Sequence, residues 1–305
     1  MPLAYYSRTA TSDFWAEHWG RESPEALARI AETSPLTGLI LKNLPPAGAR
    51  VLEAGCGLGQ YVVLLRRDGY HAIGTDWSLP PLRACRDWTA GTPLAVMDLR
   101  RLGFRSEAFA AYVSLGAVEH DPEGPAPILV EARRVLAPSG VLILSVPYVN
   151  LARRLAAGWV RYRNRRRRDA GGQFYQFAFS RHEARAFIER NGFRVLSATP
   201  YDPARLLRTA WGRLARPHRV DAARPATGER DSQDVKREAS PVRGSARAGA
   251  PQAALRDIES RRNSTRARAA TSIRRGAVKA LKRLLYTRLG LYTLGHMILF
   301  IAVKR

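Results

Sequence analysis

The feature that most constrains this chain is the stretch from residue 50 to residue 60, which reads Arg-Val-Leu-Glu-Ala-Gly-Cys-Gly-Leu-Gly-Gln. A short apolar run passes through Glu53 into a loop of alternating glycines at positions 55, 57 and 59, and a helix is expected over Tyr61–Arg67. Glycine is needed where backbone turns sharply or approaches a ligand closely, because a Cβ would clash. The stretch therefore predicts a strand, a ligand-binding loop and a helix in the manner of an open α/β sheet.

Two classes of ligand fit such a loop. A dinucleotide-binding loop reads G-x-G-x-x-G and places the pyrophosphate on a helix N-terminus. Here the third glycine comes one residue early, and Gln60 occupies the expected position. The carboxylate of Glu53 would repel a pyrophosphate and favours a cationic ligand. A tight turn that binds nothing is the remaining interpretation.

Acidic residues follow the next two expected strands. Residues 70–76 read as a strand that ends in Asp76, and residues 93–97 as a short strand followed by Asp98. An acid about twenty residues beyond a glycine loop can accept hydrogen bonds from both ribose hydroxyls, which is the role expected of Asp76. An apolar strand at 109–115 then leads into Glu119 and His120, and a helix, turn and strand follow over residues 131–146.

The pattern E-x-G-x-G-x-G that begins at Glu53, with the elements that follow it up to residue 148, resembles the class I S-adenosylmethionine (SAM) dependent methyltransferases of the small-molecule, type 11-like kind. The resemblance implies SAM as the cofactor, with the acid of the loop at its amino end and Asp98 beside the adenine amino group. It also implies a Rossmann-like α/β sheet of order 3-2-1-4-5-7-6, with strand 7 antiparallel and helices on both faces. The residues expected to bind the cofactor are Glu53, Gly55, Cys56, Gly57, Gly59, Asp76, Trp77, Met97, Asp98, Leu99 and Leu115.

Four segments are expected along the chain. Residues 1–35 are rich in aromatic side chains and form a helical cap, with Ser23 and Pro24 at a helix start. In relatives such a segment closes over the cofactor, and the alternative is that its aromatic residues cap the core. Residues 36–204 are the SAM-binding core, with a basic insertion at 149–179. Residues 205–290 are a basic, largely disordered insertion that ends in an amphipathic helix, and residues 291–305 supply the last core strand.

Local signals support the end of the core. Ser180 and Glu183 form a capping box, the helix that they begin ends near residue 191, and Phe193–Thr199 reads as the sixth strand. Residues 296–303 read as the seventh strand, which the resemblance places between the fifth and the sixth. Residues 221–270 have almost no large apolar side chains, so burial cannot offset the entropy of ordering them.

The charge of the chain is unevenly distributed. Its formal net charge is +24, but residues 1–150 carry 14 Lys and Arg against 15 Asp and Glu. The excess lies in the second half, mostly as arginine, in two amphipathic segments at 151–168 and 273–285. Both follow the carboxyl ends of expected strands, so they are predicted to frame the substrate entrance. Basic helices that also carry Trp, Leu and Tyr suit an anionic membrane surface, and a solvated basic face is the alternative.

The acceptor is expected to be a small molecule or a lipid-linked compound. Nucleic acid, RNA above all, is the less favoured alternative, because the Asn/Asp-Pro-Pro-aromatic motif of base-amine methylation is replaced here by Ser114–His120 and no Pro-Cys pair is present. A non-catalytic SAM-binding scaffold is a third class, and the intact acids argue against it. His120 is the candidate general base for a hydroxyl acceptor, and a structural histidine is the competing interpretation.

Neither a metal nor a secretory pathway is expected. No Cys, His and carboxylate cluster has metal-ligand spacing. Cys56 and Cys85 are the only cysteines, too few for a disulfide framework, and Cys56 reads as a small packing residue. The N-terminus lacks a signal-peptide pattern, and the apolar stretch at 289–303 is too short to span a bilayer. The expected location is cytoplasmic, with peripheral membrane association.

Overall fold

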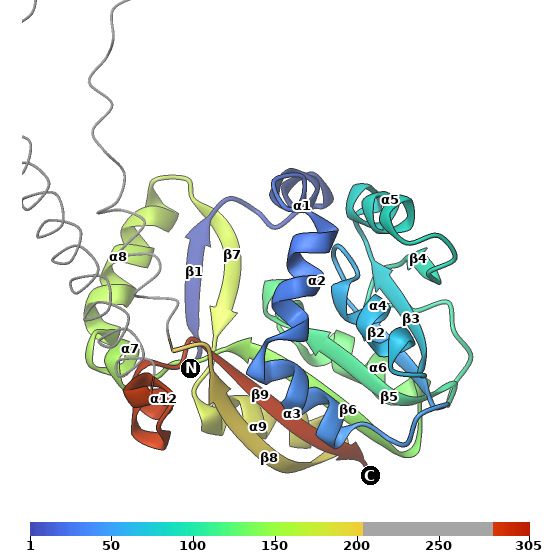
Figure 1. Cartoon of the computed structure of the whole chain (residues 1–305). Helices are drawn as coiled ribbons and strands as arrows, with labels where there is room; N and C mark the ends of the chain where they lie inside the picture. The colour runs from blue at the N-terminus through green and yellow to red at the C-terminus, as the bar shows by residue number, and fades with distance from the viewer. Residues whose placement is uncertain (204–282) are drawn as a thin grey trace, which may run out of the picture. The chain divides into compact units, whose positions relative to one another are not determined.

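The computed structural model describes residues 1–203 and 283–305, which form the α/β body drawn in colour in Figure 1. The predictions of disorder over 221–270 and of an amphipathic helix from residue 273 lie outside the described residues, except for residues 283–285 at the end of that helix. Among the residues described, no helix is long and apolar enough to cross a membrane.

A seven-stranded sheet forms the centre of the protein, with the order β4-β3-β2-β5-β6-β9-β8. β9 is antiparallel to both of its neighbours, and the other pairs are parallel. This order confirms the predicted arrangement 3-2-1-4-5-7-6. The strands are β2 (Arg50–Ala54), β3 (His71–Asp76), β4 (Leu94–Val96), β5 (Phe109–Leu115), β6 (Leu136–Pro147), β8 (Phe193–Tyr201) and β9 (Met297–Lys304).

Helices cover both faces of the sheet, because successive strand residues point to opposite sides. Val51 and Val113 pack with one group of helices, whereas the adjacent Leu52 and Tyr112 pack with the other. The first group is α2 (Pro24–Glu32), α3 (Pro35–Asn43), α4 (Gln60–Arg67) and α5 (Leu79–Trp88). The second group is α6 (Ala126–Val135) and α9 (Arg181–Arg190).

The predicted helix starts are present. Ser23 caps α2 through the amide of Ala26, with Pro24 as the first helical residue. At α9, the Ser180 side chain accepts from the Glu183 amide, and the Glu183 carboxylate accepts from the Ser180 amide. Each contact satisfies a backbone N–H group that a helix end leaves without a partner.

A second, two-stranded sheet was not predicted from the sequence. β1 (Leu3–Ser7) pairs antiparallel with β7 (Gln173–Ala178), so the N-terminus is held by a segment far along the chain. Figure 1 shows this pair between α8 on one side and α1 on the other. The remaining elements are α1 (Ser12–Trp19), the short 3-10 helix η1 (Val118–His120), α7 (Leu151–Leu155), α8 (Ala157–Asp169) and α12 (Arg288–Leu294).

Candidate functional site

The glycine loop leaves β2 in a conformation that side chains disfavour. Gly55, Gly57 and Gly59 have φ of 78°, 52° and 68°, in the left-handed region that glycine adopts without strain. A Cβ on Gly57 would lie 2.7 Å from the Trp19 ring, and one on Gly55 would lie 2.6 Å from the Ala117 Cβ. The loop is therefore fitted closely between α1 and the segment that follows β5.

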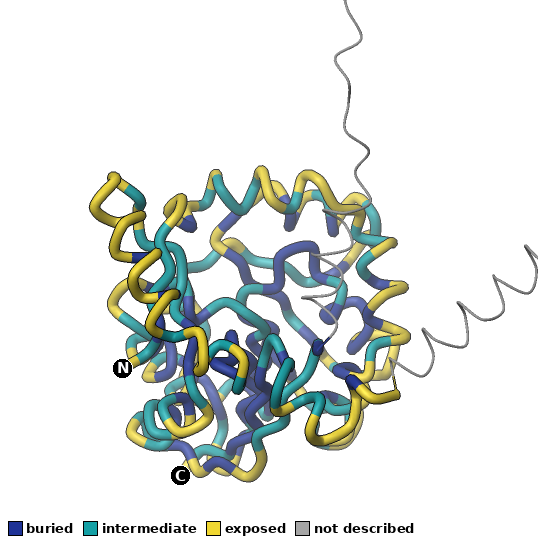
Figure 2. The backbone as a smooth tube through the Cα atoms, turned by 90° about the vertical axis from the view of Figure 1, so that its left-hand side faces the viewer, coloured by how far each residue is buried: buried dark blue, intermediate teal, exposed yellow. Residues whose placement is uncertain are grey.

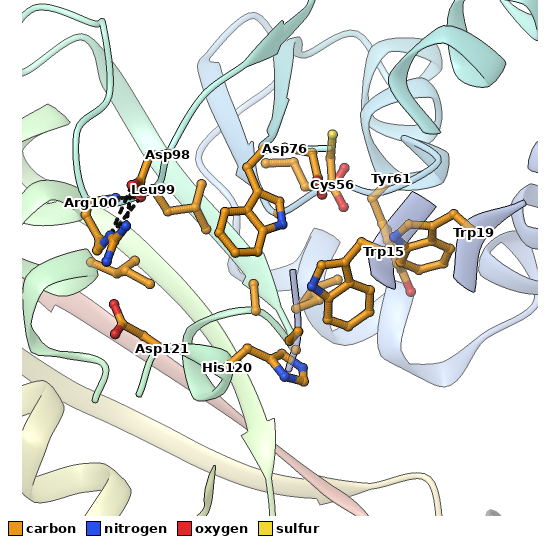
Figure 3. A pocket seen from close by; sticks show the side chains of 18 of the residues that line it. Trp15, Trp19, Cys56, Tyr61, Asp76, Asp98, Leu99, Arg100, His120 and Asp121 are labelled. Carbon is orange, nitrogen blue, oxygen red and sulfur yellow. Dashed lines mark hydrogen bonds and ion pairs between the residues drawn. The ribbon is translucent and has the colours of Figure 1, made fainter. Parts of the chain in front are cut away.

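A cavity of about 230 Å³ opens at the carboxyl ends of β2, β3 and β5. Figure 3 shows Asp76 and Cys56 on one side of it, Trp15 and His120 on another, and the pair formed by Asp98 and Arg100 at its edge. Of the residues predicted to bind the cofactor, eight line the cavity: Glu53, Gly55, Cys56, Asp76, Trp77, Asp98, Leu99 and Leu115.

The other three predicted cofactor residues are not part of the cavity lining. Gly57 lies beneath Trp19, as described above, and its amide contacts Asp76. Gly59 approaches Cys85, whose sulfur would lie 2.6 Å from an added Cβ. Met97 packs against the hydrophobic core, while its amide donates to the Asp76 carbonyl. These residues shape the loop and the strand end instead of facing the cavity.

Glu53 is a buried acid whose surroundings offer little to stabilise a negative charge. Its side chain lines the cavity, the residue is 2% exposed, and among the described residues its Oε2 has no hydrogen-bond partner. Burial raises its pKa to about 8, the Val62 amide lowers it and the charge of Asp76 raises it further. A cation in the cavity would stabilise the charged form, so the site fits a ligand with a positive group at this position.

Asp76 ties the glycine loop to the end of β3. Its Oδ2 accepts from the Gly57 amide and its Oδ1 from the Ser78 amide, both at 2.9 Å. Burial nevertheless raises the pKa of this carboxyl. A carboxylate has about four acceptor positions, so Asp76 can still accept hydrogen bonds from a ligand's hydroxyl groups.

Asp98 lies at the cavity edge in an ion pair that was not predicted from the sequence. Its Oδ2 is 2.7 Å from Arg100 Nη2, and this hydrogen-bonded partner lowers the pKa of the carboxyl. Arg100 also lines the cavity. The two residues are two positions apart in the sequence, where nothing but their opposite charges indicated that they would pair.

The ring of His120 is held by β7. Its Nδ1 lies 2.8 Å from the carbonyl oxygen of Tyr175. Because a carbonyl only accepts, Nδ1 carries the hydrogen and Nε2 carries the lone pair. Burial lowers the pKa of His120 to about 4, although the Tyr175 carbonyl opposes this, so the ring is neutral at physiological pH.

Glu119 lies beside this histidine but in a more enclosed position. Its Oε1 is 4.0 Å from His120 Nε2, and its Oε2 has no hydrogen-bond partner among the described residues. Burial raises the pKa of Glu119 to about 8. Both groups are therefore mainly uncharged at pH 7, which leaves a neutral base next to a protonated acid.

The aromatic residues of α1 close one side of the cavity. The Trp15 ring lies 4.9 Å from that of His120 and 6.2 Å from that of Trp19, and both tryptophans line the cavity. No residue of α1 is buried in the core. Within residues 1–35, α1 thus lies against the cavity, whereas Ala31 of α2 packs with the core.

The basic segment over α7 and α8 does not line this cavity, contrary to the prediction that it frames the substrate entrance. Val160 of α8 packs with Leu3 of β1 and Ala178 of β7, so the two-stranded sheet lies between α8 and the cavity. The second basic segment lies outside the described residues except for residues 283–285 at its end. In residues 1–203 and 283–305, no group of His, Cys, Asp and Glu is arranged to hold a metal ion.

Comparison with known proteins matches residues 52–144 to the family described as "Methyltransferase domain". A "Probable tRNA methyltransferase 9B" of Mus musculus is 33% identical over 101 residues, which are 32% of this chain and 22% of that protein. A "Ubiquinone biosynthesis O-methyltransferase" of Xylella fastidiosa is 30% identical over 142 residues, which are 44% of this chain and 54% of that protein. The chain thus spans between about a fifth and about half of the length of these curated relatives.

Among solved structures, a chain of the complex between the Haloferax volcanii Trm112 methyltransferase activator and a methyltransferase has a TM-score of 0.52. Its sequence identity is 16%, and the match covers 96% of this chain and 97% of that chain. At this identity the likeness concerns the fold alone.

Proposed function

Because residues 52–144 form a methyltransferase domain with the class I, SAM-dependent fold, we propose that the chain transfers the methyl group of SAM to an oxygen of a small-molecule or lipid-like acceptor. One observation carries the proposal. A single cavity is lined both by Glu53 and Asp76, beside the glycine loop, and by His120 and Trp15. Cofactor and acceptor would therefore meet within one enclosed space, and positioning alone can contribute ~7–11 kcal/mol to the rate.

The cofactor end of the cavity suits SAM in charge and shape. Glu53 would face the positively charged amino end, Asp76 would accept from the ribose hydroxyls, and Asp98 with Arg100 would lie near the adenine. SAM supplies a methyl group that its sulfonium has already activated. The chain has to bind it, exclude water and hold the acceptor in line, and Trp15 and Trp19 are placed to enclose the reacting groups.

His120 is proposed as the general base. Its Nε2 would take the proton of the acceptor hydroxyl, and the Tyr175 carbonyl, which accepts from Nδ1, would stabilise the resulting imidazolium. We expect His120→Asn to reduce kcat by about 10²- to 10⁴-fold while the Kd for SAM stays unchanged. An unchanged kcat at saturating acceptor would instead assign His120 a structural role.

The first test is calorimetric titration with SAM and, separately, with NAD. We expect SAM to bind, NAD not to bind, and Asp76→Ala to abolish SAM binding. Asp87→Ala is the matched control, because Asp87 is an exposed acid on α5 that does not line the cavity. Failure of the folded protein to bind SAM would refute the proposal.

RNA is the second candidate acceptor, favoured by the relative named as a tRNA methyltransferase and by the arginines of α8. Methyl-labelled SAM, incubated with the protein and either a lipid extract or bulk tRNA, separates the two. Label in the organic phase supports the lipid-like acceptor, and label in tRNA supports the RNA candidate.

We further propose that the enzyme meets the lipid-like acceptor at an anionic membrane surface.

A further inference from the structure

A second groove, of about 730 Å³, lies apart from the methyl-transfer cavity. It is formed where α7, α8, the first turn of α9 and α12 meet the end of β6 and the start of β1. Figure 1 shows α7, α8 and α12 together on one side of the molecule, and Figure 2 turns that side toward the viewer. Buried Leu3, Tyr148 and Val149 line the groove together with Arg154, Arg161, Arg181, His182 and Arg185.

The arginines of the groove are largely without acidic partners. Arg154, Arg161 and Arg181 are exposed and form no ion pair with any described residue, whereas Arg185 pairs with Glu189 at 3.0 Å. Among the described residues that line the groove, the one acid is Glu183, which is engaged in the capping box and lies 2.8 Å from the Met1 amino nitrogen. Several positive charges on the lining of one groove therefore favour the binding of an anion there.

Two further features direct this positive charge into the groove. Burial and the neighbouring Tyr292 raise the pKa of the Tyr148 phenol, and the positive charges of Arg181 and Arg154 partly oppose this rise. Both charges therefore act on the same residue of the groove lining. The N-terminus of α9 lies at the same place, and the positive end of a helix dipole adds to the attraction for an anion.

Exposed apolar side chains flank the groove. Leu155, which follows Arg154 on α7, is 83% exposed. Leu289, which lies one helical turn before Tyr292 on α12, is 71% exposed. Trp159, on the next turn of the chain, is 59% exposed, with Arg163 over its ring at 4.5 Å. Binding of a free anion or an RNA backbone would leave these two leucines exposed to water. At a bilayer surface, by contrast, they would be buried in the acyl boundary next to the lipid phosphates.

We propose that this groove binds the phosphate headgroup of an anionic phospholipid, with Leu155 and Leu289 entering the acyl boundary. A lipid headgroup and a free phosphate would both place a phosphate group between Arg154, Arg161 and Arg181. The exposed leucines would favour the lipid over free phosphate. The groove deepens the membrane-surface part of the proposed function, but its occupancy requires neither SAM nor a methyl acceptor.

The test measures partition of the full chain, without SAM, onto phosphatidylglycerol vesicles and onto phosphatidylcholine vesicles. We expect binding to phosphatidylglycerol alone, and a decrease of about 30-fold in Arg161→Gln/Arg181→Gln, since each arginine at an anionic surface contributes about fivefold. Arg83→Gln/Arg86→Gln is the matched control, because it removes the same charge from exposed positions on α5. An equal loss in both double variants would reduce the effect to net charge and overturn the proposal.

A third variant separates the lipid from other phosphates. Leu155→Ser/Leu289→Ser is expected to weaken vesicle binding while inorganic pyrophosphate, measured by calorimetry, still competes for the groove. The lipid assignment would be overturned if the wild-type protein bound pyrophosphate but no vesicles. It would also be overturned if tRNA, and not the vesicles, bound in the groove. Circular dichroism of the same variants checks their fold without SAM, so failure of the methyltransferase proposal remains distinguishable from failure of this one.

Discussion

At the residue scale, the site is characterised by two acids that the fold keeps protonated. Burial raises the pKa values of Glu53 and Glu119 to about 8, yet only Glu53 lines the cavity. A ligand with a positive group should therefore change the protonation of Glu53 directly. Glu119 should instead affect the stability of the fold.

The first prediction concerns proton release. At pH 7 the Glu53 carboxyl is mostly protonated, because its pKa is about 8, and a cationic amino group beside it would lower that pKa. SAM binding at pH 7 should therefore release close to one proton. Calorimetry in buffers of different ionisation enthalpy measures this, and Glu53→Gln should abolish it. Identical binding heats in all buffers would contradict the assignment.

The second prediction concerns stability and pH. A folded-state pKa of about 8 for Glu119, against 4.5 for the free group, means that the folded state binds more protons than the unfolded state between these values. Stability thus falls as pH rises through this window. Glu119→Gln should therefore match the wild type near pH 4.5 and exceed it at pH 9, by about 1–3 kcal/mol in urea denaturation. A difference independent of pH would argue against a buried, protonated Glu119.

At the element scale, α1 is positioned by its neighbours in sequence and in space. β1 pairs with β7 just before it, and Thr11 caps its first turn through the Phe14 amide. The helix then places Trp15 against His120 and Trp19 over Gly57. The two-stranded sheet is therefore what holds the aromatic side of the cavity in place.

Gly57→Ala tests this arrangement. An alanine at φ of 52° is strained by about 1–2 kcal/mol, and its Cβ would lie 2.7 Å from the Trp19 ring. We expect SAM affinity to fall by at least about tenfold, with partial recovery in Gly57→Ala/Trp19→Ala. Gly91→Ala is the control, since φ there is 78° but nothing lies within 4 Å of the added Cβ. If both single variants bind SAM equally well, contact between the loop and α1 is not important for the site.

At the scale of the whole molecule, the last strand completes the sheet. β9 lies between β6 and β8, and Leu299, Phe300 and Ala302 are at most 1% exposed. Residues 204–282, which lie outside the described part of the chain, come between β8 and this strand in the sequence. Tyr201 pairs with Met297, so the chain leaves and re-enters the sheet at adjacent positions.

Replacement of residues 207–284 by a short glycine-serine linker should therefore leave SAM affinity within about threefold, since insertions at such positions are tolerated. Removal of residues 297–305 should instead abolish cooperative unfolding, because it takes out a strand that is paired on both sides. Circular dichroism and SAM titration of both variants provide the comparison. A linker variant that fails to bind SAM would assign the replaced residues a part in the site.

Much of the sheet and of the cofactor side of the cavity could be predicted from local patterns in the sequence. The glycine loop at 55–59, the acid at the end of β3 and the capping box of α9 each depend on residues within a few positions of one another. Such patterns reflect backbone preference and strand or helix periodicity, which act before distant segments meet. The sheet order followed from the resemblance that these motifs carry.

Only the tertiary structure decided the acceptor side and the outer surface. The β1–β7 pairing, the Tyr175 carbonyl that sets the tautomer of His120, and the groove around Arg154 join segments that are distant in sequence. No periodicity of a single segment encodes which distant partner it meets, because that choice depends on the packing of the whole chain. For the same reason the basic segment after β6 was placed at the cavity by sequence, whereas packing of Val160 against β1 and β7 places it on the far side of the two-stranded sheet.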